Sequence, residues 1–222
     1  MAGKERAEDL TGRARIRDAA LLEFAERGVK GATIRGIAKA AGVSPALVQH
    51  HYGTKEALRQ ACDEYVLAAT REVKEESLQG GMASPGFMEI AMRTALPIQR
   101  YLARALTDGS QAAATLFDDV VAYTREVLET GRPGVAKPST DDLHAYAAVM
   151  TGMSLGSFVL NEHLSRALGA GVLTGEGYPR MALAMIDIYD DRLLSPELAA
   201  QARAGLKSML ASREQSPSEE NR

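Results

Sequence analysis

The chain has 222 residues, enough for one small and one larger helical domain with a sizeable core. Tryptophan is absent, only 5% of residues are aromatic, and alanine, leucine and glutamate are abundant, a composition that favours an all-α fold. The net charge of −3 argues against a generally basic protein, but residues 1–60 hold 11 Lys/Arg against 7 Asp/Glu and the rest hold 15 against 22. A basic N-terminal part on an acidic body is typical of local contact with DNA.

The chain shows no sign of export or membrane insertion. Its N-terminus, MAGKERAEDL, lacks the apolar core of a signal peptide, and no apolar run approaches the roughly eighteen residues of a membrane span. The single cysteine, Cys62, cannot form an intramolecular disulfide. Cys62 falls on an apolar helical stripe, which favours a packed thiol over a redox sensor. We therefore expect a cytoplasmic protein with no membrane partner.

Residues 1–11 are polar and predict a flexible arm. Lys4 and Arg6 leave open a contact of this arm with a DNA minor groove, although acidic residues lie among them. A first helix is expected from about Arg13 to Arg27, with Gly28 as its C-terminal stop.

Residues 33–55, TIRGIAKAAGVSPALVQHHYGTK, predict two short helices joined by a tight turn. Thr33 can cap the first helix, and Gly42 supplies the positive φ that ends it. Ser44 can cap the second helix, and Pro45 fits its first position, where no backbone N–H is needed. Two helices joined in this way form a helix-turn-helix, whose second helix enters the DNA major groove.

An ordered set of positions through residues 12–60 resembles the N-terminal domain of TetR/AcrR (tetracycline-repressor-type) regulators. It consists of Ile16, Ala20, Phe24, Gly28, Thr33, Ile37, Ala38, Gly42, Val43, Ser44, Tyr52, Lys55, Glu56 and Leu58. The resemblance and the helical spacing both imply that Val43, Val48 and Tyr52 face the core, and the resemblance implies that Thr33, His51 and Lys55 contact phosphates. Where the family most often has a tyrosine, this chain has Gln49, so the phosphate contact of that tyrosine does not carry over.

The residue types also suggest how the second helix would read DNA. Small apolar side chains at its start can touch thymine methyl groups, Gln49 can pair with adenine or a phosphate, and Arg35 can reach guanine or the backbone. The predicted DNA-binding residues are Thr33, Arg35, Ser44, Pro45, Ala46, Leu47, Gln49, His50, His51 and Lys55. The pair His50–His51 does not predict a metal site, because adjacent helical residues point about 100° apart and no further ligand lies at a suitable spacing.

The rest of the chain predicts a helical regulatory and dimerisation domain, residues 61–213, and a disordered tail, residues 214–222. Residues 80–86 interrupt the helical pattern, and Pro97 is expected to split or kink the helix that follows. Helices are expected at about 54–78, 110–130, 141–168, 178–190 and 196–212, and the helical stretch interrupted by Pro97 is expected to begin at about residue 87.

Two sets of residues in this domain predict function. Ala148, Gly152 and Gly156 recur every four residues and would let a second helix approach closely, as at a dimer interface, which the family resemblance also implies. The candidate pocket residues for a small-molecule effector are Met88, Met92, Phe117, Tyr123, Met150 and Met153, although filling of the core explains the same residues.

The catalytic motifs in the chain lack the required context. Gly152–Gly156 matches the GxSxG nucleophile motif at Ser154 but lies within a helical pattern, with no strand before it. The glycine-rich segment 169–175 follows a helix and has one residue too many for a dinucleotide loop. We therefore expect neither an enzyme nor a bound cofactor or metal.

The sequence as a whole predicts an all-α homodimeric repressor that binds double-stranded DNA at a palindromic operator and is released by a small-molecule effector. One alternative is a helical ligand-binding protein or enzyme in which the helix-turn-helix is structural only. Another is an architectural or partner-binding protein of similar fold, with a solidly packed regulatory domain. The sequence does not specify the effector, the operator, or repression as against activation.

Overall fold

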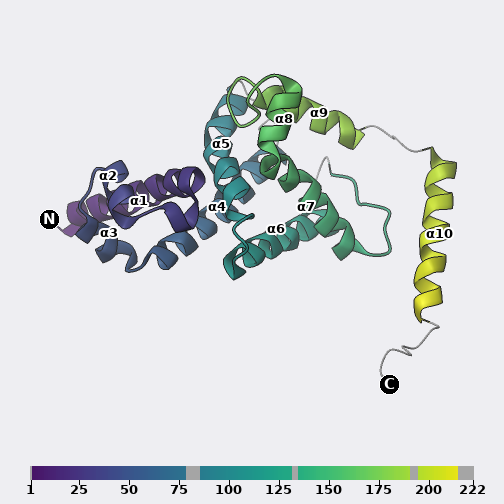
Figure 1. The fold of residues 1–222 in the computed structure, drawn as a ribbon, viewed down its shortest axis with the longest axis horizontal. Helices are drawn as coiled ribbons and strands as arrows, with labels where there is room; N and C mark the ends of the chain where they lie inside the picture. The colour runs from purple at the N-terminus through teal and green to yellow at the C-terminus, as the bar shows by residue number, and fades with distance from the viewer. Residues whose placement is uncertain (1, 79–85, 132–134, 191–194, 215–222) are drawn as a thin grey trace. The chain divides into compact units, whose positions relative to one another are not determined.

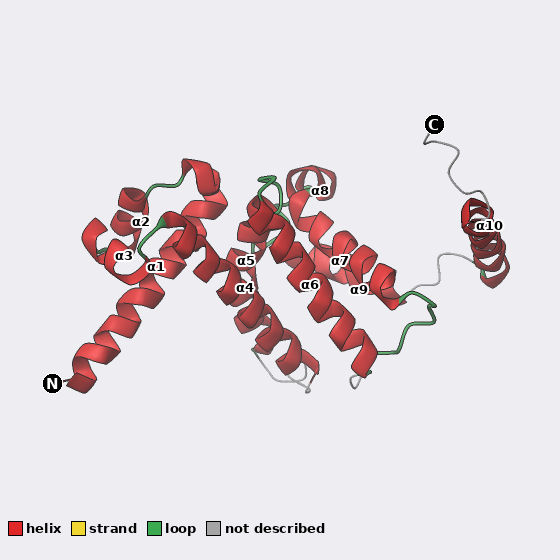
Figure 2. Cartoon of the chain, turned by 90° about the horizontal axis from the view of Figure 1, so that it is seen from below, coloured by secondary structure: helices red, strands yellow, loops and turns green. Residues whose placement is uncertain are grey.

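The computed structural model describes residues 2–78, 86–131, 135–190 and 195–214, and these residues form helices and loops with no strand (Figures 1 and 2). The predicted all-α fold is therefore confirmed. The helices are α1 (Ala2–Gly31), α2 (Ile34–Ala41), α3 (Pro45–Tyr52), α4 (Lys55–Leu78), α5 (Phe87–Ala105), α6 (Gln111–Thr130), α7 (Leu143–Val159), α8 (Asn161–Leu168), α9 (Tyr178–Asp190) and α10 (Pro196–Glu214).

The chain divides into two compact units, residues 1–178 and residues 179–222. In the first unit, α1, α2 and α3 form an N-terminal head, and α4 leads from this head into a body of α5 to α8 (Figure 1). The second unit holds α10 and nearly all of α9.

One apolar core runs from the head into the body without interruption. Phe24 in α1, Ile37 in α2, Val48 in α3, Leu58 in α4 and Tyr101 in α5 all belong to it, and each is at most 1% exposed. The rings of Phe24 and Tyr101 lie 6.4 Å apart at their centres, so α1 packs directly on α5. A shift of α5 would therefore act directly on α1, a helix of the head.

The α1 and α5 helices differ in detail from the expected ones. The α1 helix begins at Ala2, so it includes most of the segment predicted as an arm, and Gly28 breaks it with φ 68° and ψ 164°, at the predicted stop. The α5 helix runs through Pro97 from Phe87 to Ala105, so the predicted split does not occur. The break predicted at residues 80–86 lies almost wholly outside the described residues, as do residues 215–222 of the predicted tail.

The prediction of one helix over residues 141–168 is wrong. The chain bends by 68° between α7 and α8 at Leu160, which has φ −89° and ψ 19°. Asn161 Nδ2 donates a hydrogen bond to the Phe158 carbonyl (2.7 Å) and so satisfies an acceptor at the end of α7. No single described helix is long and apolar enough to cross a membrane, and α7 with α8 meets that test only as this bent pair.

Candidate nucleic-acid interface

The caps that the sequence predicts define α2. The Oγ1 atom of Thr33 accepts a hydrogen bond from the Gly36 backbone N–H at 3.0 Å. Gly42 has φ 65° and ψ 38°, a left-handed conformation in which its own N–H reaches the carbonyls of Ala38 and Lys39. The turn into α3 therefore follows directly from two local residue choices.

The α3 helix presents one face to the core and another to solvent. Ser44 Oγ accepts a hydrogen bond from the Leu47 N–H (3.2 Å) and Pro45 begins the helix, while Val48 is 1% exposed. Among the predicted DNA-binding residues of α3 and its cap, Leu47 and His51 are half-buried, and the exposed ones are Ser44, Pro45, Ala46, Gln49 and His50. The exposed set includes the first turn of α3, which contacts base edges when such a helix docks in a major groove.

Tyr52 fastens the end of α3 to α1. Its hydroxyl donates a hydrogen bond to the Arg13 carbonyl (2.8 Å), and the Arg13 guanidinium carbon lies 5.3 Å from the centre of the Tyr52 ring. Burial raises the pKa of the Tyr52 phenol above its ordinary value, so the phenol stays protonated and keeps donating this bond. The orientation of α3 is thus held by a side chain at its far end.

Lys55 has a structural contact that the sequence does not reveal. Its Nζ atom donates hydrogen bonds to the carbonyls of Val29 (2.8 Å), near the end of α1, and Ala32 (3.1 Å), in the turn between α1 and α2. An ammonium group has three N–H donors, so one donor beyond these two can still reach a phosphate. The predicted phosphate contact of Lys55 stays a prediction. Its observed role is to link the start of α4 to the end of α1 and the turn that follows.

The remaining predicted contact residues lie in different environments. Arg35 is exposed on α2, near Thr33. The rings of His50 and His51 meet edge to face at 5.5 Å, and His51 Nε2 comes within 3.5 Å of a Cβ built on Gly12 of α1. The described residues contain no group of three or more His, Cys, Asp or Glu side chains that could hold a metal ion.

The predicted effector residues do not gather around a hollow that the structure describes. Phe117 and Met150 pack on the small core between α6 and α7, and Met92 is half-buried in α5. Tyr123 is 2% exposed, with the Arg71 guanidinium carbon 4.7 Å from its ring centre, while Met153 is 60% exposed. Met88 lies in α5, but its side chain is outside the described ones.

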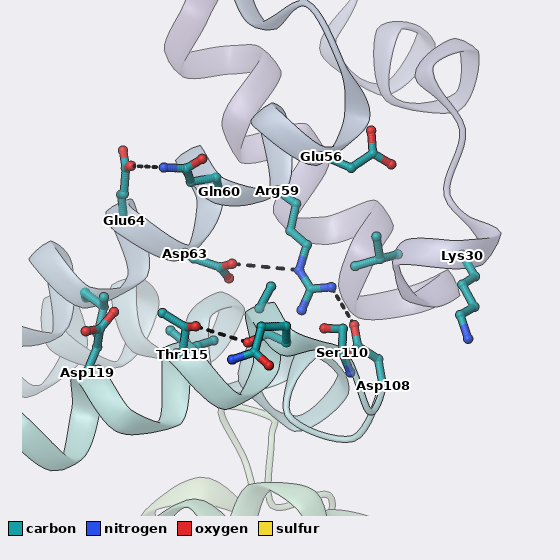
Figure 3. Close-up of a pocket in the computed structure, with 15 residues that line it drawn as sticks. Lys30, Glu56, Arg59, Gln60, Asp63, Glu64, Asp108, Ser110, Thr115 and Asp119 are labelled. Carbon is teal, nitrogen blue, oxygen red and sulfur yellow. Dashed lines mark hydrogen bonds and ion pairs between the residues drawn. The ribbon is translucent and has the colours of Figure 1, made fainter.

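Two hollows lie elsewhere in the described part of the chain. One, of about 700 Å³, lies between the end of α1, α4 and the start of α6 (Figure 3). The other, of about 580 Å³, is lined by residues of α1, α5, the end of α7, the start of α8 and the loop after α8. None of the six candidate effector residues lines either hollow.

The predicted dimer residues lie on α7, beside an exposed apolar surface. Ala148, Gly152 and Gly156 are half-buried, and a Cβ on either glycine would meet no other heavy atom within 4 Å among the described residues. Val149 is 63% exposed and Met153 60%. Ser154 lies in the middle of α7, so its GxSxG motif does not form the strand-to-helix turn of a nucleophile elbow.

A buried charge cluster joins α4 to the body, and sequence reasoning missed it. Arg59 is 7% exposed, its Nη1 atom lies 2.7 Å from Asp108 Oδ2, and its Nε atom lies 3.7 Å from Asp63 Oδ2. The Tyr101 hydroxyl donates a hydrogen bond to Asp63. The spacing of Arg59 and Asp63 on one helix face was a signal that could have been used, but nothing local points to Asp108.

The environments of the two carboxyl groups differ. Burial raises the pKa of Asp63, although the Tyr101 hydroxyl and the Arg59 guanidinium oppose this shift. Burial also acts to raise the pKa of Asp108, but the hydrogen bonds from Ser110, together with Arg59, outweigh it and hold that pKa below its ordinary value. Asp108 is thus the firmly ionised partner of Arg59.

Comparison with known protein families finds two matching regions. Residues 16–62 match the model described as bacterial regulatory proteins, tetR family, and residues 94–195 match the tetracyclin repressor-like C-terminal domain. The first region covers the second half of α1, all of α2 and α3, and the start of α4, and the second runs from within α5 to just beyond α9.

A relative and two solved structures extend the likeness. The HTH-type transcriptional regulatory protein RaaS of Mycobacterium tuberculosis is 38% identical over 157 residues, which are 70% of this chain and 73% of the relative. A putative TetR-family transcriptional regulator from Rhodococcus sp. superposes with a TM-score of 0.53 at 18% identity, covering 80% of this chain and 97% of that one. A structure described as the molecular basis for control of antibiotic production by bacterial hormones has a TM-score of 0.50 at 22% identity, covering 78% and 95%. At these identities the two structures establish the fold alone.

Proposed function

Because this chain belongs to the TetR family of bacterial regulatory proteins and is a transcriptional regulator, we propose that it is a cytoplasmic homodimeric repressor, released from a palindromic operator by a small-molecule effector. The observation that carries the proposal is the exposed first turn of α3. Capped by Ser44 and fastened through Tyr52, the helix presents Pro45 and Ala46 of this turn, and Gln49 of the next, to solvent.

The size of the head favours a twofold arrangement. The α3 helix has 8 residues, so one head offers few base contacts, and two heads double the contact area and the length of sequence read. Two α3 helices about 34–36 Å apart would enter successive major grooves on one side of the duplex. The excess of Lys and Arg in residues 1–60 adds attraction to phosphates, which depends on salt.

The α7 helix supports a second copy as partner. Ala147, Thr151 and Leu155 face the body and are buried, yet the opposite side of the helix is also apolar. A helix that is apolar on all sides belongs in an interior, and Val149 and Met153 remain exposed in the single chain. A second α7 packed along Gly152 and Gly156 would cover them.

The proposed release mechanism uses the shared core. An effector that binds better to a body with the heads spread would shift the population away from the state that fits the operator. The direct packing of α1 on α5 and the passage of α4 from head to body provide the mechanical connection. The change needed is small, because the two heads must match the groove spacing within about an ångström or two.

Selection of bound sequences from a random duplex pool tests the proposal. Purified wild-type protein should enrich a palindrome. Gln49→Ala should weaken binding to this palindrome, or change the free energy that discriminates between bases at one position by about 1–3 kcal/mol. The matched control is Gln201→Ala, an exposed glutamine in α10, which should leave the selected sequence unchanged. If the protein is folded and dimeric but enriches no sequence, the helix-turn-helix is a structural element only, and the result favours a ligand-binding protein or an enzyme.

A further inference from the structure

The hollow between α1, α4 and α6 lies at the junction of head and body. Val29 and Lys30 come from the end of α1, Arg59 and Leu67 come from α4, and Leu116 comes from α6. Its volume of about 700 Å³ falls in the range of roughly 300–1,000 Å³ that is usual for small-molecule sites. Because its walls belong to both the head and the body, an occupant would contact α4 and could change its position.

Arg59 marks this hollow as more than a packing gap. Its side chain is nine-tenths buried, and Figure 3 shows the guanidinium pointing into the middle of the lining residues. Nη1 is paired with Asp108, but Nη2 and Nε have no hydrogen-bond partner within the described part of the chain. A buried N–H group without an acceptor is unfavourable, and both nitrogens are covered in this structure. An occupant that separates α4 from α6 and offers an acceptor atom to Nη2 would therefore be bound preferentially.

The charges around the hollow select the sign of the occupant. The lining residues include two positive side chains, Lys30 and Arg59, and five carboxylates, which are Glu56, Asp63, Glu64, Asp108 and Asp119. After burial and the opposing effects of Tyr101 and Arg59, the charges of Asp108 and Asp119 also raise the pKa of Asp63, a sign that the carboxylates repel one another. An anion would meet this repulsion, whereas a cation near Asp119 would relieve it, and Glu64 adds a further negative charge to the lining.

The rest of the wall is apolar. Val29, Leu67, Ala112 and Leu116 line the hollow between the charged groups, and Leu116 belongs to the continuous core of the molecule. An apolar body of the occupant can therefore be buried at the same time as its charge is paired.

We propose that this hollow, rather than the methionine-containing region, is the effector site, and that it takes an amphiphilic organic cation of drug size carrying a hydrogen-bond acceptor. The inference rests on the proposed function for its regulatory part, while the binding itself does not depend on DNA. An occupant separates α4 from the start of α6, and the head moves with α4 away from the position that fits the operator.

Fluorescence polarisation with two dyes of one ring system tests the binding. Rhodamine 6G is a cation with an ester acceptor and should bind saturably, one per chain, whereas the anionic fluorescein should bind at least about 20-fold more weakly. Tetraphenylphosphonium, a cation of similar bulk without an acceptor, should compete at least about tenfold more weakly than unlabelled rhodamine 6G itself. Equal binding of the two dyes, or no saturable binding, would overturn the proposal.

Variants locate the site. The double variant Glu64→Gln with Asp119→Asn removes two exposed charges. Because an exposed ion pair contributes up to about fivefold in affinity, the double variant should bind rhodamine 6G about tenfold more weakly. Glu129→Gln removes one exposed charge near the far end of α6 and should leave the affinity within about twofold. Ala112→Phe fills the hollow without changing its charge and should also weaken the dye. Loss in the control alone, or no loss in the other two variants, would place the dye elsewhere.

Release from DNA separates the two proposals. With the selected duplex, rhodamine 6G should weaken operator binding by at least about tenfold in the wild type and by much less in the double variant, which also controls for contact between dye and DNA. A dye that binds in the hollow yet leaves operator affinity unchanged would refute the regulatory role. If the protein enriches no duplex at all, the proposed function fails, and the polarisation data still decide the ligand site.

Discussion

Replacing Lys55 by methionine should weaken the folded head measurably. The substitution keeps much of the aliphatic stem but removes both hydrogen bonds from Nζ to the Val29 and Ala32 carbonyls. Bonds from a charged donor contribute about 1.5–3 kcal/mol each, and Lys55 is half-buried, so we expect a total loss of about 2–3 kcal/mol after discounting for solvent. For a chain of this size this loss corresponds to a fall of about 4–12 °C in the thermal midpoint.

Thermal unfolding followed by far-ultraviolet circular dichroism is the assay, with Lys39→Met as its control. Lys39 is exposed near the end of α2, and its loss should shift the midpoint by no more than about 2 °C. A midpoint for Lys55→Met equal to that of the wild type would refute the reasoning that this ammonium group closes the head.

The same variant addresses the predicted phosphate contact. If the remaining N–H of Lys55 contacts a phosphate, Lys55→Met should also reduce the salt slope of DNA binding by about one. A lower midpoint with an unchanged slope would leave Lys55 a purely structural role and remove it from the DNA interface.

Three further predictions concern the cap of α3, the surface of α7 and the buried ionisable groups. Ser44→Ala removes the acceptor for the Leu47 N–H and should lower stability by about 1 kcal/mol and weaken operator binding, as measured by thermal unfolding and titration with DNA; unchanged values would refute the cap. Val149→Asp places a charge on the exposed apolar side of α7 and should convert dimer to monomer in light scattering, whereas a persistent dimer would exclude this face. Burial raises the pKa of Cys62 from 9.0 to about 12 and raises that of Tyr101 as well. Their contribution to stability is full below about pH 9 and is lost as the pH rises towards 12, because these groups then ionise in the unfolded chain before they ionise in the folded one. Urea unfolding at about pH 8 and pH 11 should show this fall, with a smaller fall for Cys62→Ala; equal stability at both values would contradict it.

Much of the head could be predicted from sequence because its determinants are local. Thr33, Gly42, Ser44 and Pro45 each act within three or four residues, through a cap, a positive φ or a missing N–H. The helical spacing that predicted burial of Val48 is similarly local. In such segments the residue type and its position along the helix are sufficient.

The features that escaped prediction depend on distant partners. Lys55 reaches carbonyls 23 and 26 residues earlier, and Arg59 meets Asp108 from another helix. At the bend at Leu160, Asn161 donates a hydrogen bond to the Phe158 carbonyl, but the apolar pattern continues across the bend and conceals it in the sequence. The candidate effector set with its methionines stays a prediction, because methionine is common in both pockets and cores and its spacing alone does not distinguish the two.

The central claim, that two heads read one duplex through α3 with twofold symmetry, is tested most directly by changing the spacing of the half-sites. The affinity of the wild-type protein should be measured for the selected palindrome and for the same duplex with about five base pairs inserted at its centre. The insertion turns one half-site by about half a helical turn, so the account predicts a loss of at least about 100-fold. Equal affinity for the two duplexes would contradict it, because it would mean that each head binds on its own.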